Sequence, residues 1–138
     1  MSQVEGIGSM QQPSKIFIEK RLKGKKLVQV GSTCHLIVNP DMGSKNLIVG
    51  YLVLEAKSRT KPNIHPNSEE AFYITKGKGI IKVNNEARNV EKGDVIFIPK
   101  NVWHEFENTE DEPMEWVLII SPPPSEEEYK SSPWKIEE

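Results

Sequence analysis

The sequence is poor in the side chains that most often build metal or redox sites: it has one cysteine and three histidines among 138 residues. A single cysteine, Cys34, cannot form a disulfide bond within the chain or a cysteine-rich zinc cluster. Any bound metal would therefore depend on histidine and carboxylate side chains. The histidines available for this purpose are His35, His65 and His104.

Long apolar runs are also absent, because no segment approaches the roughly 18 to 20 apolar residues that cross a bilayer. The N-terminal stretch MSQVEGIGSMQQPSK lacks the basic start and apolar segment of a signal peptide. The net charge of -2 argues against a general affinity for nucleic acid, which needs a strongly basic face. We therefore expect a cytoplasmic protein that binds neither a membrane nor nucleic acid.

What the sequence does contain is a series of short apolar runs in two-residue alternation, separated by many of its ten prolines and nine glycines. This alternation is typical of β-strands, and no long stretch shows an apolar stripe at helical spacing. Short strands with frequent turns favour an all-β sandwich or barrel over an α/β fold. The predicted strands cover residues 15–21, 27–30, 34–38, 47–56, 71–76, 79–83, 87–90, 95–99, 104–107 and 114–121.

A chain of this length has room for one hydrophobic core, so we expect one domain. Residues 1–13 are predicted to be a flexible leader and residues 14–121 the barrel. The prolines at 122–124 cannot continue a strand ladder, so residues 122–138 form a separate acidic arm. Trp134 and Ile136 give this arm two large apolar side chains. The arm either docks through them, on the barrel or on a second subunit, or is disordered.

Two segments carry the residues that point to chemistry: NIHPNSEEAFYITKG at 63–77 and GDVIFIPKNVWHEFEN at 93–108. They resemble the paired motifs of the cupin superfamily, G-x5-H-x-H-x(3,4)-E-x6-G and G-x5-P-x-G-x2-H-x3-N. The resemblance covers about half of the chain directly. It implies an antiparallel double-stranded β-helix, or jelly-roll barrel, and a homodimer.

Most motif positions are matched, and two are not. The matched residues are His65, Glu70 and Gly77 in the first motif and Gly93, Pro99, His104 and Asn108 in the second. Asn101 replaces the glycine of the second motif, and asparagine tolerates a left-handed backbone better than other non-glycine residues. We therefore expect the turn before His104 to survive.

The second unmatched position is Asn63, which replaces the first histidine of the first motif. In an alternative alignment, His65-Pro66-Asn67 is the His-x-His pair with its second histidine lost. The spacing from Glu70 to Gly77 favours Asn63 as the substituted position. An amide oxygen is a weaker ligand than imidazole for a borderline transition metal, so metal affinity should fall or one coordination position should open.

The resemblance implies one divalent metal ion held by His65, Glu70 and His104, with Asn63 in the place of the fourth ligand. Two histidines and one carboxylate with open positions are found in non-haem iron oxygenases and in catalytic zinc sites. The sequence does not distinguish iron, manganese, zinc, nickel and cobalt. His35 has no partner at ligand spacing and is interpreted as ordinary strand sequence.

Strand alternation predicts a pocket next to this site. Phe72 and Ile74 share the facing of Glu70, and Phe106 shares that of His104, so these three should line the space below the metal. Arg59 and Lys61 precede the histidine segment and would attract an anionic group of a substrate, unless they are solvated loop charges.

Two functions remain open. In the first, the chain is a metal-dependent enzyme acting on a small organic molecule, with dioxygenase chemistry ahead of lyase or isomerase chemistry. In the second, it is a non-catalytic cupin, a small-ligand binding or dimerisation module whose metal site is degenerate; Asn63 is the main support for this alternative.

Overall fold

The computed structural model describes residues 16–137, so the predicted leader at 1–13 lies outside the described residues. The described chain is almost entirely β-structure, which confirms the predicted all-β fold. The strands are β1 (Lys25–Gln29), β2 (Ser32–Val38), β3 (Ile48–Leu54), β4 (Glu69–Lys76), β5 (Lys78–Val83), β6 (Glu86–Glu91), β7 (Val95–Ile98), β8 (His104–Glu107), β9 (Met114–Ser121) and β10 (Lys135–Ile136). A 3-10 turn, Pro40–Met42, and a short helix, α1 (Glu126–Ser131), complete the described elements.

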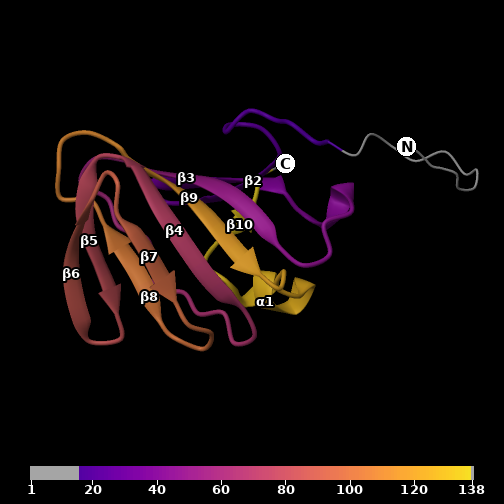
Figure 1. Ribbon diagram of the computed structural model, residues 1–138. Helices are drawn as coiled ribbons and strands as arrows, with labels where there is room; N and C mark the ends of the chain where they lie inside the picture. The colour runs from indigo at the N-terminus through magenta and orange to yellow at the C-terminus, as the bar shows by residue number, and fades with distance from the viewer. Residues whose placement is uncertain (1–15, 138) are drawn as a thin grey trace, which may run out of the picture.

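The strands form two antiparallel sheets (Figure 1). The larger has the order β10-β1-β2-β3-β9-β4-β7, and the smaller has the order β6-β5-β8. One hydrophobic core joins the two layers, because it contains Ile81, Val90 and Phe106 from the smaller sheet together with residues of the larger one. The two sheets are therefore the two walls of one barrel.

Alternation along the strands decides which side chains enter the barrel. In β4, Glu70, Phe72 and Ile74 are buried, whereas Glu69, which precedes them, and Tyr73, which lies between Phe72 and Ile74, are exposed. Strand β9 lies between β3 and β4, and Met114, Trp116, Leu118 and Ile120 form its buried face. The predicted inward facing of Phe72 and Ile74 is confirmed.

Three aromatic rings form the centre of this core. The Trp116 ring stacks on Phe106 with a centroid distance of 4.2 Å, and Phe72 meets Phe106 edge to face at 5.2 Å. Such aromatic pairs contribute about 0.5 to 1.5 kcal/mol beyond the burial of their area. Because Phe72 and Phe106 follow Glu70 and His104 at two-residue spacing, this packing fixes the strands that carry the polar groups.

The strand predicted at 15–21 is wrong for the residues that the structure describes. Residues 16–20 form no strand, and a turn begins at Arg21. The alternation there has no buried face, since both Phe17 and Ile18 are exposed. An apolar run becomes a strand only where a sheet and a core are available to it.

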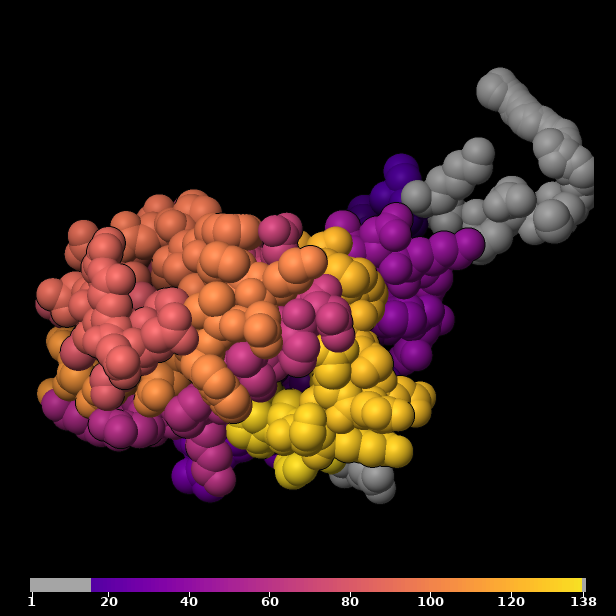
Figure 2. All heavy atoms as spheres, turned by 90° about the horizontal axis from the view of Figure 1, so that it is seen from below, coloured from indigo at the N-terminus to yellow at the C-terminus, as the bar shows by residue number. Residues whose placement is uncertain are grey.

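The C-terminal arm is ordered over its described residues and docks on its own barrel. Strand β10 pairs with β1, placing Ile136 opposite Leu27, and α1 lies near the end of β9 (Figure 1). Trp134 and Tyr129 are partly buried against the core. In Figure 2 the arm forms a continuous surface, in yellow, beside the violet residues of the β2–β3 region. No helix among residues 16–137 is long and apolar enough to cross a membrane.

Candidate metal centre

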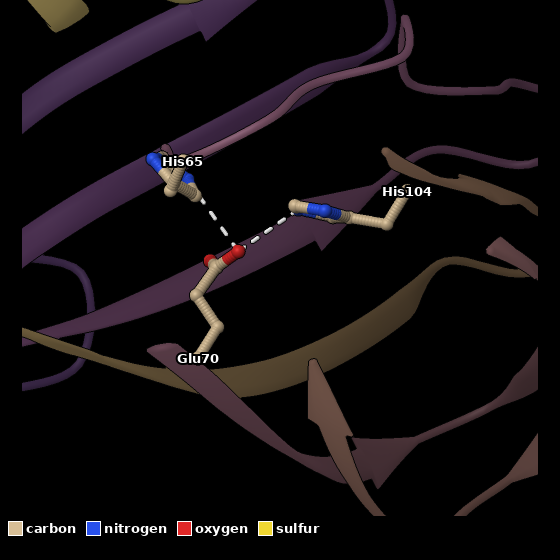
Figure 3. A group of neighbouring side chains, drawn as sticks. All are labelled: His65, Glu70 and His104. Carbon is tan, nitrogen blue, oxygen red and sulfur yellow. Dashed lines mark ion pairs between the residues drawn. The ribbon is translucent and has the colours of Figure 1, made fainter. Parts of the chain in front are cut away.

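The structure brings together three potential ligands from separate parts of the sequence. His65 lies in the loop before β4, Glu70 lies in β4, and His104 begins β8. Glu70 Oε1 is 2.9 Å from His104 Nε2 and 3.4 Å from His65 Nε2. Figure 3 shows both imidazoles directed at this carboxylate. The exposed fractions of the three side chains are 12%, 5% and 7%, so the cluster is largely shielded from water.

Backbone hydrogen bonds hold the two histidine segments together. Asn63 and His104 exchange N–H to carbonyl bonds of 2.9 and 3.0 Å, and the N–H of Asn101 donates to the carbonyl of His65 at 2.8 Å. Asn101 has a φ of 62°, which confirms the left-handed turn expected where the motif has glycine. The two motifs therefore form one rigid unit around the cluster.

The orientation of His104 is set by its other ring nitrogen. Nδ1 lies 3.1 Å from the carbonyl oxygen of Val102, which can only accept a hydrogen bond. Nδ1 therefore carries the proton, and in the neutral ring the lone pair of Nε2 faces Glu70 Oε1. Two lone pairs at 2.9 Å repel each other unless a cation lies between them or beside them.

In the metal-free protein a proton serves as that cation. Burial lowers the pKa of His104, but the hydrogen bond and negative charge of Glu70 outweigh it, so the pKa is raised overall. Burial lowers the pKa of His65, and the charge of Glu70 only partly opposes this. The site therefore favours a neutral His65 beside a His104 that retains a proton.

The residues present fit a divalent metal ion. Glu70 Oε1 is buried and lies within ion-pair distance of the Nε2 atoms of both histidines. The potential ligand atoms of the three side chains lie within 4.8 Å of one another. Ligand atoms bound at about 2.1 Å lie about 3.0 to 3.4 Å apart for bond angles near 90 to 109°, which matches the two measured separations. The cluster can hold a metal ion whose identity the donor set does not fix.

Asn63 lines the same cavity as the two histidines. Its Oδ1 accepts a hydrogen bond of 2.9 Å from the N–H of Ile64, which leaves one lone pair on this oxygen. Asn67, the residue concerned in the alternative alignment, is exposed. The structure thus places Asn63 and not Asn67 beside the cluster.

A cavity of about 60 Å³ adjoins the cluster, with room for about four to six water molecules. Its wall is mainly apolar and includes Phe72 and Phe106. Ile74 is buried deeper and does not line the cavity, which corrects its expected role in the pocket.

The remaining sequence candidates separate into two groups. Lys61 lines the cavity, whereas Arg59 is exposed and pairs with Glu107 at 3.6 Å. Arg59 is therefore a surface charge with a partner of its own. His35 lies in β2 opposite Tyr51, outside the cavity lining, in agreement with its interpretation as strand sequence.

The sequence interpretation missed four cavity residues on the C-terminal arm: Glu128, Tyr129, Ser132 and Trp134. The sequence did contain a signal for the start of a helix here, because Ser125 and Glu128 have the spacing of a helix capping box. Both of its hydrogen bonds form, at 3.2 Å and 2.9 Å. Nothing in the sequence, however, shows where the helix that starts there docks.

Comparison with known proteins identifies the family. The model of the cupin domain matches residues 50–120, about half of the chain. The chain belongs to the cupin family. An uncharacterized protein of Methanocaldococcus jannaschii is 33% identical to this cupin over 100 residues, covering 71% of this chain and 79% of that protein. The oxalate-binding protein of Thermotoga maritima is 27% identical over 119 residues, covering 84% and 96%.

Solved structures agree on the fold. The polyketide cyclase RemF of Streptomyces resistomycificus superposes with a TM-score of 0.68, covering 83% of this cupin and 91% of that chain. The identity is 18%, so this likeness concerns the barrel and not the chemistry.

Proposed function

We propose that this cupin is a metal-dependent enzyme that binds one divalent ion through His65, Glu70 and His104 and acts on a small organic molecule in the adjoining cavity. The observation that carries the proposal is the buried Glu70 carboxylate, whose Oε1 lies 2.9 Å from His104 Nε2 and 3.4 Å from His65 Nε2. One carboxylate and two imidazole nitrogens at this spacing are the ligand types of a divalent-metal site.

When bound, such a metal supplies Lewis-acid polarisation of an oxygen, or activation of O₂ if it is iron. The protein's own residues have other tasks. The Val102 carbonyl keeps His104 in the tautomer with Nε2 free, and Phe72 and Phe106 limit the space for water next to the cluster. Asn63 in place of a fourth histidine leaves a position for a substrate atom. Dioxygenase chemistry is our first assignment, with lyase or isomerase chemistry next.

The size of the cavity restricts the substrate. A space of about 60 Å³ suits a molecule of a few heavy atoms, whereas a polycyclic polyketide would need a displaced wall. By size alone, the cavity therefore suits the oxalate in the name of one relative better than the polyketide in the name of the other.

The metal site is tested by substituting one histidine. His104→Ala should lower the affinity for Co²⁺ by at least about 100-fold, since even residues outside the coordination sphere commonly contribute 10- to 100-fold. Isothermal titration calorimetry gives the affinity, and elemental analysis of the purified protein gives the native metal. His35→Ala is the matched control and should bind Co²⁺ as the parent does. Equal binding by both variants would refute the proposed site.

The alternative is a non-catalytic binding module, and Asn63 is the observation in its favour. A missing histidine weakens the ligand set, so the cavity would bind its small molecule without a resident metal. Absence of stoichiometric metal from the purified parent protein, together with no measurable Co²⁺ affinity, would favour this alternative.

We also propose a homodimer formed through the outer face of the larger sheet. Tyr73, Val95, Phe97 and Ile119 are exposed there on β4, β7 and β9, and strand pairing places them in adjacent rows. Light scattering should give twice 15.7 kDa for the parent and 15.7 kDa for Phe97→Glu. Val30→Glu, at an exposed apolar residue outside this face, should remain dimeric. A parent mass of 15.7 kDa would exclude the dimer.

A further inference from the structure

Unpartnered polar atoms gather around one cavity. Among the described residues, six buried side-chain nitrogen or oxygen atoms have no hydrogen-bond partner. Four of them belong to residues that line the metal-site cavity: Glu70 Oε1, Trp116 Nε1, Glu128 Oε2 and Tyr129 Oη. Proteins rarely leave buried polar atoms unpaired, and the concentration at one cavity points to a bound molecule that completes them.

Two of these atoms come from the arm, and the helix cap fixes one of them. Glu128 Oε1 accepts a hydrogen bond of 2.9 Å from the N–H of Ser125. The Ser125 hydroxyl in turn accepts one of 3.2 Å from the N–H of Glu128. With Oε1 engaged in this way, Oε2 is held on the buried side without a partner.

The arm also lies beside the metal cluster. Glu128 and Tyr129 line the same cavity as His65, Glu70 and His104. Each of these two arm residues contributes one buried polar atom without a partner, Glu128 Oε2 and Tyr129 Oη. The arm and the two cupin motifs therefore enclose one cavity.

We propose that Glu128, Tyr129 and Trp116 select the ligand of this cavity, an inference that rests on the proposed metal site. The ligand is a small uncharged molecule with two functions besides its metal-binding atom. It offers an acceptor to the Trp116 N–H and a hydroxyl or amino donor to Glu128 Oε2. The Tyr129 hydroxyl either donates or accepts. A compound that bears a hydroxyl or amide group in this way provides hydrogen-bond partners for the unpartnered atoms of these three side chains.

The same wall disfavours anionic ligands. Two carboxylates, Glu70 and Glu128, line the cavity, and Lys61 is the lining residue with a permanent positive charge. Lys61 is exposed, so water weakens its attraction for an anion within the cavity. A dianion such as the oxalate named for the Thermotoga relative would be attracted by the metal ion but repelled by the charge of Glu128.

The test uses the protein saturated with Co²⁺ and three probes of similar size: imidazole, 1-methylimidazole and acetate. Imidazole carries an N–H opposite its metal-binding nitrogen, 1-methylimidazole lacks that donor, and acetate is an anion. The visible spectrum of bound Co²⁺ reports the binding of each. We expect the parent to prefer imidazole over 1-methylimidazole by about tenfold, the usual size of a buried hydrogen bond to a charged group.

Glu128→Gln keeps the capping oxygen and removes the charge. It should reduce the imidazole preference at least threefold and strengthen acetate binding. Glu127→Gln, on the exposed side of the same helix, removes an equal charge and should change neither. Tyr129→Phe should weaken imidazole binding less than Glu128→Gln does. Identical probe preferences in Glu128→Gln and Glu127→Gln would overturn the assignment.

A metal-free measurement separates this inference from the metal proposal. Cys34 lines the same cavity, so its labelling by methyl methanethiosulfonate reports access past the arm. Tyr129→Ala should accelerate labelling about tenfold or more, whereas Tyr73→Ala, on the outer face, should not. If the parent binds no Co²⁺ but this difference is found, the metal proposal fails, whereas the arm stands as a wall of the cavity. Equal labelling rates would refute the arm as a cavity wall, whatever the metal result.

Discussion

The two ends of the barrel interior share the same strands but differ in what their inward side chains do. Along β4 the inward series is Glu70, Phe72 and Ile74, and along β8 it begins with His104 and Phe106. At one end Glu70 and His104 are polar and adjoin the cavity; next to them Phe72 and Phe106 form part of its wall and pack with Ile74 into the apolar core. The packed end fixes the strand positions on which the geometry of the polar end depends.

The first prediction breaks the packed end and has the largest expected effect. Trp116→Ala removes a ring that is 1% exposed and stacked on Phe106, so it should lower the free energy of unfolding by about 3 to 5 kcal/mol. Urea denaturation followed by circular dichroism measures this. Trp103→Ala, at a residue 51% exposed, should cost about 0.5 kcal/mol or less. Equal losses for the two variants would mean that the aromatic cluster does not hold the barrel.

The second prediction concerns the polar end and its dependence on pH. Because Glu70 raises the pKa of His104 above its usual 6.5, a proton competes with a metal for Nε2. Co²⁺ affinity should therefore fall as pH is lowered through that pKa, by up to about tenfold per pH unit. Calorimetric titrations between about pH 6 and pH 8 measure it.

The stability of the metal-free fold depends on pH in the opposite direction to the Co²⁺ affinity. A raised folded-state pKa means that protonated His104 stabilises the metal-free fold below about pH 6.5, and that this contribution is lost as pH rises through the raised pKa. His65, whose pKa is lowered, opposes part of this at low pH. A Co²⁺ affinity that stays constant across this range would show that His104 Nε2 is not a ligand.

The third prediction adds a ligand to the polar end and has the smallest expected effect. Asn63→His restores an imidazole at a position lining the cavity, and it should raise Co²⁺ affinity several-fold without changing the unfolding free energy by more than about 1 kcal/mol. Asn67→His is the matched control and should bind Co²⁺ as the parent does, since Asn67 is exposed. A gain for Asn67→His alone would support the alternative alignment.

The sequence correctly predicted the features that depend on local periodicity and motif spacing. Two-residue alternation placed Glu70, Phe72 and Ile74 on one face, and motif spacing selected His65 and His104 out of three histidines. It was insufficient where tertiary contacts decide. Residues 16–20 alternate like a strand yet have no buried side, and the acidic arm folds back because Trp134 and Tyr129 find space against the core.

The short β10 has a consequence for self-association. It adds to β1 through the Leu27–Ile136 and Val28–Lys135 pairs and through the Lys26–Glu137 ion pair of 3.0 Å. Strand β1 would otherwise present unpaired backbone groups along one margin of the larger sheet, a template for other chains. The segment that encloses the cavity therefore also shields the barrel from aggregation along this margin, so shortening the arm would affect solubility as well as ligand choice.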